Sequence, residues 1–152
     1  MKLNYTLFCS LFALAACSPN EGDVEKNALN MLNNARMLMQ NREYHAARDT
    51  IFSMRQTYPK AFQARTAGII VLDSIELMEA QDSILVLGNQ LRMEEDFLSS
   101  LQSVKNSKDY DAILQQKKTI FHLKQHIDEV EAKVKFFLRK IDIDQEKGNP
   151  TK

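Results

Sequence analysis

Apolar side chains recur at every third or fourth position along most of the chain, and this spacing predicts helices. The first such run covers residues 24–40 and the second covers residues 44–57, with the polar residues 41–43 between them. Pro59 ends the second run, because the residue before a proline disfavours helical geometry. The sequence shows no strand-like alternation bounded by turn signals, so we predict an all-α fold.

The third run begins at Ala61 and contains no proline before residue 104. Residues 61–72 are apolar on almost every side, which is typical of a buried helix, and Gly68 would let that helix approach its neighbours closely. We expect it to close the core of the first pair and then to continue outward, with a total length of about 66 Å. The fourth run follows Asp109, a predicted N-cap, and extends to about residue 144.

The apolar positions of the third and fourth runs mirror each other about Ser107. A chain that folds back there would bring Leu91 opposite Leu123, and short loops join antiparallel neighbours. This pattern predicts an antiparallel two-stranded coiled coil. Glu94 and Gln116 interrupt the apolar seam near the turn, so we expect that end to be the looser one.

Charged side chains flank the predicted seam. The acidic residues Glu76, Glu79 and Asp82 of the third run are expected to face a basic cluster on the fourth, each pair contributing about 0.2–1 kcal/mol. The alternative is that this cluster binds an anionic partner, although favourable charge near a helix C-terminus accounts for it without one. The basic cluster consists of Lys133, Lys135, Arg139 and Lys140.

The first pair of helices resembles a tetratricopeptide repeat over about 34 residues. Small residues at two key positions would let its helices pack closely, and Pro59 ends the repeat. The chain departs from the family at Met31 and Asn34, so any helical hairpin with small residues at its crossing remains the alternative. One repeat does not build the peptide groove that about three stacked units form. The matching positions are Met31, Ala35, Leu38, Tyr44, Ala47, Ile51, Met54 and Pro59.

The N-terminal segment has a different pattern. Lys2 precedes an apolar stretch of roughly 12 residues, which is too short to span about 30 Å of hydrocarbon as a helix. A positive start, a short apolar run and small residues at its end indicate a secretory signal peptide. The sequence from Leu14 to Cys17 (LAAC) resembles the lipobox of bacterial lipoproteins. Ordinary cleavage after residues 13–15, which would leave Cys17 as a free thiol, is the alternative.

The lipobox resemblance implies that Cys17 becomes the first mature residue and carries fatty acids such as palmitate. Two or more acyl chains anchor a protein stably. The absence of aspartate after Cys17 favours outer-membrane sorting, by resemblance to Gram-negative lipoproteins, and leaves periplasmic or surface exposure open. The whole chain resembles small helical lipoproteins of the Bacteroidota cell envelope. The predicted organisation is a signal peptide (1–16), a lipidated tether (17–23), a tetratricopeptide-like region (24–72), an antiparallel coiled-coil hairpin (73–146) and a disordered tail (147–152).

Candidate chemistry is sparse. Both cysteines, Cys9 and Cys17, lie in the N-terminal segment, so the mature chain would have no thiol for a disulfide, a nucleophile or a metal. His122 and His126 have the i, i+4 spacing of metal ligands, but no third histidine or cysteine is near, and a solvated flank is the simpler interpretation. The 20 basic and 20 acidic residues provide no net field for nucleic acid. We expect no cofactor, no metal and no catalytic activity.

These features favour a membrane-tethered interaction or scaffold protein. A periplasmic coiled-coil holdase is the alternative, but it would need an exposed apolar tip or inner face, and residues 105–111 are polar. We expect membrane contact through the lipid and a protein as partner, while the oligomeric state is open. Two surfaces are candidates for that partner: the basic cluster, and the outer side of the first pair at Met37, Met39, Arg42 and Tyr44.

Overall fold

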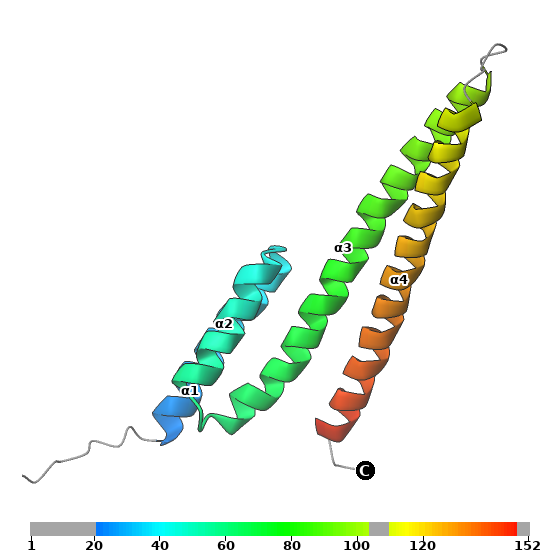
Figure 1. Cartoon of the computed structure of the whole chain (residues 1–152). Coiled ribbons are helices and arrows are strands. Elements are labelled where there is room, and N and C mark those ends of the chain that lie inside the picture. Colours follow the sequence, from blue (N-terminus) through cyan, green and yellow to red (C-terminus); the bar gives the residue numbers. More distant parts are fainter. Residues whose placement is uncertain (1–20, 104–109, 149–152) are drawn as a thin grey trace, which may run out of the picture.

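The structure, a computed structural model, describes residues 21–103 and 110–148, so Cys17 and the predicted N-cap Asp109 lie outside the described residues. Helices make up nearly all of these ranges, and no strand occurs in them, which confirms the all-α prediction. The first two helices form a short hairpin, here called the head, beside the base of a long hairpin, here called the arm (Figure 1). The head consists of α1 (Glu21–Gln40) and α2 (Tyr44–Thr57), and the arm of α3 (Phe62–Ser103) and α4 (Tyr110–Gly148).

The helix boundaries agree closely with the predicted runs between residues 40 and 103. α1 begins at Glu21, however, so the last residues of the predicted 17–23 tether are helical. α3 passes through positions 72 and 73 without a break, and Ile75 beyond them still belongs to the core that α3 forms with the head. α4 continues to Gly148, past the predicted start of the tail at residue 147.

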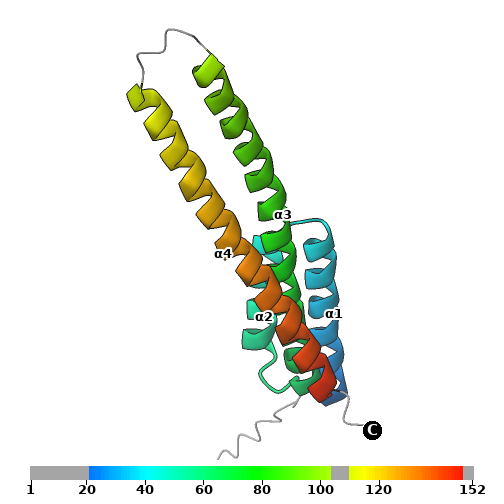
Figure 2. The same cartoon turned by 90° about the vertical axis from the view of Figure 1, so that its right-hand side faces the viewer.

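The turn between α1 and α2 is a Schellman motif. The backbone N–H of Glu43 donates to the carbonyl oxygen of Leu38 (2.9 Å), and that of Arg42 donates to the carbonyl oxygen of Met39 (3.0 Å). Arg42 occupies the left-handed position, with φ of 66°, where glycine is usual. This geometry ends α1 at the polar residues 41–43 and turns α2 back along it (Figure 2).

The head and the first half of α3 enclose the main core. Every position that carries the tetratricopeptide resemblance except Pro59 belongs to this core or packs against it, and the head is a closely packed helical hairpin. A Cβ atom at Gly68 would lie 3.3 Å from Met54 Cε and 3.5 Å from Ile51 Cγ2, so the glycine permits the close approach of α3 that the sequence predicts. The fully buried residues are Ala28, Leu32, Ala35, Ala47, Ile51, Met54, Ala61, Ala64 and Ile75.

α3 and α4 run antiparallel along the arm, which confirms the predicted hairpin (Figure 2). Asp73 pairs with Lys140 near the base, whereas Glu95 pairs with Lys124 nearer the turn, so contacts proceed in opposite directions along the two helices. Each partner lies within about five residues of the position mirrored about Ser107. Among the described helices, the backbone of α4 approaches only that of α3.

The two polar residues that interrupt the seam bind each other. Gln116 is buried, and its side-chain amide donates to the Glu94 carboxylate (2.6 Å) and to the Glu94 carbonyl oxygen (3.0 Å). A single polar position in an apolar seam specifies the register of a coiled coil. Glu94 and Gln116 are therefore hydrogen-bonded to each other where they interrupt the apolar seam. They lie beside Ile120 and Leu123, the best-buried seam residues of α4.

Candidate functional site at the junction of head and arm

Four acidic residues, here called the acidic spiral, occupy every third position of α3: Asp73, Glu76, Glu79 and Asp82. In an α-helix a step of three residues rotates the side-chain direction by about 300°, which is about 60° short of a full turn. The direction therefore changes by about 180° between the first and the last member. A spiral of this kind can contact α4 at one end and the head at the other.

The first two members make the contacts that this rotation predicts. Asp73 is buried and accepts hydrogen bonds from the ammonium group of Lys140 on α4. Glu76 binds two helices at once, because Lys133 Nζ of α4 lies 2.7 Å from one carboxylate oxygen and Arg48 Nε of α2 lies 2.8 Å from the other. Glu76 thereby links α2, α3 and α4.

The last two members contact the head. Arg48 also pairs with Glu79. The Tyr44 hydroxyl donates to one oxygen of Asp82 (2.5 Å), and Arg42 Nη1 lies 3.2 Å from the other. The expectation that Glu79 and Asp82 face the basic cluster is therefore wrong, since the 60° steps carry both residues round to α2 and the turn before it.

These contacts shift the titration of the groups involved. Burial alone would raise the pKa of Glu76, but hydrogen bonds from Lys133 and Arg48 lower it below its ordinary value. Burial would lower the pKa of Arg48, but hydrogen bonds to Glu79 and Glu76 raise it. Burial, and then the hydrogen bond to Asp82, raise the pKa of the Tyr44 phenol. At neutral pH the junction thus combines fixed charges with a neutral tyrosine donor.

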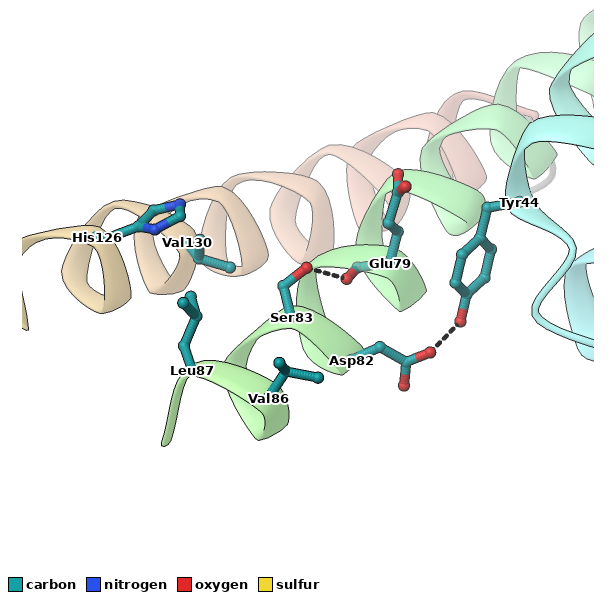
Figure 3. A pocket seen from close by; sticks show the side chains of 8 residues that line it. All are labelled: Tyr44, Glu79, Asp82, Ser83, Val86, Leu87, His126 and Val130. Carbon is teal, nitrogen blue, oxygen red and sulfur yellow. Dashed lines mark hydrogen bonds between the residues drawn. The ribbon is translucent and has the colours of Figure 1, made fainter. Parts of the chain in front are cut away.

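A groove of about 340 Å³ opens beside this network, between α3 and α4 where the head ends (Figure 3). Tyr44 and Asp82 form its polar end, and aliphatic side chains form much of its wall. The Ser83 hydroxyl donates to the carbonyl oxygen of Glu79 within its own helix (2.8 Å), so it is not paired with a base. This arrangement suits the binding of an apolar group with a polar end. The lining residues are Tyr44, Glu79, Asp82, Ser83, Val86, Leu87, His126 and Val130.

The outer side of the head does not form one continuous binding surface. Met37 exposes 61% of its surface, whereas Met39 packs against the core. Tyr44 is half-buried and directed to Asp82, and the same carboxylate holds the guanidinium of Arg42. Of the four residues predicted here, Met37 and Arg42 are therefore exposed, although Arg42 is paired with Asp82, whereas Met39 and Tyr44 are half-buried.

The basic cluster on α4 is also divided. Lys133 and Lys140 neutralise members of the acidic spiral. Lys135 approaches Glu131 at 3.9 Å within α4, and Arg139 is exposed. Pairing across the hairpin therefore accounts for two of the four basic residues and leaves Lys135 and Arg139 facing solvent.

Sequence reasoning missed two residues of the junction, Arg48 and Asp73. Arg48 lies one helical turn after Tyr44 and therefore on the same side of α2. Asp73 is the first of four acidic residues at a constant three-residue interval. This interval is the signal in the sequence, because it places successive acidic side chains on different sides of α3.

His122 and His126 are both exposed on α4, and His126 lines the groove. Residues 21–103 and 110–148 contain no group of three His, Cys, Asp or Glu side chains placed to bind a metal ion. None of the helices in these ranges is long and apolar enough to cross a membrane. Comparison of the chain with known protein families, curated proteins and solved structures finds no match.

Proposed function

We propose that this chain is a lipid-anchored scaffold protein of the cell envelope, attached through Cys17, that holds a protein partner away from the membrane. The lipobox-like sequence supports the anchor, and Cys17 precedes α1 by only four residues. The start of α1 and the end of α4 lie at the base of the molecule, far from the end of α3 and the start of α4 (Figure 1). An anchor there would let α3, at 42 residues about 63 Å long, extend away from the membrane.

The proposed partner surface is the part of α3 that the head leaves uncovered. The face of α3 that packs on the head recurs every eleven residues, about three turns, from Ala64 and Ile75 to Val86 and Phe97. The first two are fully buried, whereas Val86 and Phe97 expose 66% and 52% of their surfaces. Met93, 69% exposed, lies on the same face, and we call Val86, Met93 and Phe97 the distal stripe. This continuation of a core face into solvent carries the proposal, because exposed apolar patches mark interaction sites.

The anchor is tested by Cys17→Ser. The variant should leave the membrane fraction or accumulate as an uncleaved precursor, because the acceptor of the acyl chains is gone. Fractionation and fatty-acid labelling measure both results. A variant that stays in the membrane and still carries fatty acid would contradict the anchor, and this outcome is independent of the partner surface.

The partner surface is tested by the double substitution of Met93→Glu and Phe97→Glu. Cross-linking in native membranes, followed by mass spectrometry, should lose the partner, because an unpaired charge in an apolar contact is costly. Leu85→Glu is the matched control, since Leu85 is 63% exposed but points about 100° away from Val86. Unchanged partners in the double variant, or equal loss in the control, would contradict the distal stripe.

A holdase chaperone is the second candidate, and the exposed distal stripe is the observation that favours it. A holdase would suppress the aggregation of several unrelated denatured proteins, and the double substitution would abolish this effect. A scaffold would instead show a small, reproducible set of folded partners and no protection of denatured ones. Aggregation assays with the purified chain therefore separate the two candidates.

Both candidates bind rather than convert a substrate. The groove beside Tyr44 supports this view, because its serine is engaged with its own helix and its carboxylates are engaged with Arg42, Tyr44 and Arg48. Turnover of any substrate by the purified chain that is lost on a single substitution, such as His126→Ala, would overturn the proposal.

A further inference from the structure

α4 carries a second line of apolar residues besides the seam that packs on α3. Tyr110, Phe121 and Ile143 belong to a series of positions eleven residues apart, in which the third position is Ala132. Leu114 and Phe136 belong to a second series with the same interval, in which the middle position is Gln125. Eleven residues make three turns and about 20°, so such a line runs almost straight along the helix. We call Tyr110, Leu114, Phe121, Phe136 and Ile143 the outer stripe.

The outer stripe lies on the side of α4 that faces away from α3. The seam residues Ile120 and Leu123 are 8% exposed, whereas Phe121, which points about 100° from one and 160° from the other, is 58% exposed. Phe136 exposes 59% of its surface and Tyr110 exposes 73%. Since α4 approaches only α3 among the described helices, no other helix in these ranges covers the outer stripe.

The outer stripe is large enough to support an interface. Leu114 and Ile143 are 39% and 40% exposed, and with the three aromatic residues they present roughly 500 Å² on one copy, taking about 200 Å² for each full side chain. Two such surfaces together bury roughly 1,000 Å² before the flanking aliphatic stems are counted, which reaches the lower limit for a specific interface. The distal stripe has only three residues and offers less.

We infer that the outer stripe is the contact between two copies of this chain, paired through α4. Two helices pack well when their apolar positions recur with the same spacing, and a second copy supplies the same eleven-residue spacing along its whole length. The pattern fits both directions: parallel helices place each residue opposite its own copy, and antiparallel helices place Phe121 opposite Phe136 and Leu114 opposite Ile143, because each of these pairs is centred between residues 128 and 129. A contact of this kind uses the same patch on both copies, as twofold dimers do.

Two carboxylates weakly oppose this pairing and give it a signature that the binding of a different partner would lack. Asp128 and Glu129 are exposed and stand at the midpoint of the outer stripe, between Phe121 and Phe136. In a symmetric pair of α4 helices, the midpoint of one helix meets the midpoint of the other for either direction. The carboxylates of the two copies therefore approach and repel each other, which a different partner would not require.

The test is the association of the purified full-length chain in density-matched detergent, measured by sedimentation velocity over a range of concentrations. The wild-type chain should form dimers. Phe121→Glu with Phe136→Glu should weaken dimerisation by at least about 100-fold, because both residues are lost from both copies. Phe97→Glu with Leu85→Glu is the matched control, because it adds the same charges to exposed apolar positions of α3 and should leave the dimer unchanged. Circular dichroism shows that each variant keeps its helices.

Removing the midpoint charges should have the opposite effect. Asp128→Asn with Glu129→Gln should tighten the dimer by roughly two- to fivefold, as expected for the loss of like-charge pairs. A wild-type chain that sediments as a monomer at all concentrations would overturn the inference. A dimer that dissociates in the α3 control but not in the α4 variant would also overturn it. A dimer that weakens when the midpoint charges are removed would do the same. None of these outcomes requires that Cys17 carries a lipid or that the distal stripe binds a partner.

Discussion

The head and the arm consist of the same kind of amphipathic helix, but they bury their apolar residues to different extents. The two helices of the head meet the first half of α3, and Leu32, Ile51 and Ile75 are fully buried between the three helices. In the arm two helices meet, and even the best-buried seam residues of α4, Ile120 and Leu123, remain 8% exposed. Two helices leave both flanks of their contact in water, whereas a third helix covers one of them. α3 packs on the head with its first half and extends beyond it with its second half, so its role changes along its length while its apolar pattern does not.

The largest effect is expected where three helices meet. Ile75→Ala removes a fully buried side chain between α3 and the head and should lower the free energy of unfolding by about 2–5 kcal/mol. Leu91→Ala removes a half-buried seam residue of the arm and should cost about half as much or less, because less apolar area returns to water. Urea denaturation followed by circular dichroism measures both. Equal losses would mean that the seam of the arm is closed on a further side, by a contact other than the outer stripe.

Two glycines of α3 sharpen the same comparison. Gly68→Leu should destabilise the head by about 1–3 kcal/mol, since even a Cβ atom would press on Met54 Cε at 3.3 Å. Gly88→Leu lies in the arm, where a Cβ atom would meet nothing within 4 Å, and should stabilise the chain by about 0.5–1 kcal/mol because glycine is a poor helix former. Thermal unfolding of the two variants gives the signs directly. A stabilised Gly68 variant would mean that α3 packs less closely on the head than described.

The junction between the two regions depends on Glu76. Glu76→Gln should cost about 1–3 kcal/mol, because it leaves Arg48 and Lys133 without their shared carboxylate in a half-buried site. Glu95→Gln is the matched control in the arm, where Glu95 and Lys124 are about half exposed, and should cost about 0–1 kcal/mol. Equal effects in urea denaturation would show that the junction contributes no more than a surface pair.

The pH dependence of stability tests the same group. The pKa of Glu76 is lower in the folded chain than in the unfolded chain, so its contribution is complete above the unfolded value of about 4.3. The contribution is lost as the pH falls through the lower folded value. Melting temperatures measured between neutral and acid pH should therefore fall less steeply for Glu76→Gln than for the wild-type chain. Parallel curves would contradict the lowered pKa.

Much of this fold follows from apolar spacing alone. The breaks at residues 41–43 and Pro59, the mirror about Ser107 and the small residue Gly68 were enough to predict four helices, an antiparallel arm and a third helix against the head. Some of these features are helix ends, which depend on local sequence, and the others are the pairing of two helices along their length. The spacing of apolar residues indicates both the helices and the faces through which they pair.

The site was harder to predict, because it depends on where the head sits around α3. The sequence identifies Glu79 and Asp82 as flanking charges, but it does not say which neighbour lies on that flank. Asp82 and Tyr44 are 38 positions apart, and their contact requires both the Schellman turn at Arg42 and the packing of α2 on α3. Gln116 illustrates the same difficulty, since its partner Glu94 becomes visible only once the register is fixed.

The smallest expected effect concerns the point where the head ends and the free part of the arm begins. Tyr44→Phe removes the hydroxyl that donates to Asp82 and should cost about 0.5–1.5 kcal/mol at neutral pH. The pKa of Tyr44 is raised in the folded chain, so the contribution of this bond is complete below the ordinary value of about 10 and is lost as the pH rises through the folded value. The wild-type chain should therefore lose its advantage over Tyr44→Phe in strongly alkaline buffer, where Tyr110→Phe, at a 73% exposed position, should resemble the wild type. A Tyr44→Phe variant as stable as the wild type at neutral pH would mean that Arg42 alone satisfies Asp82, and that the head is held to the arm by its apolar core and by Arg48.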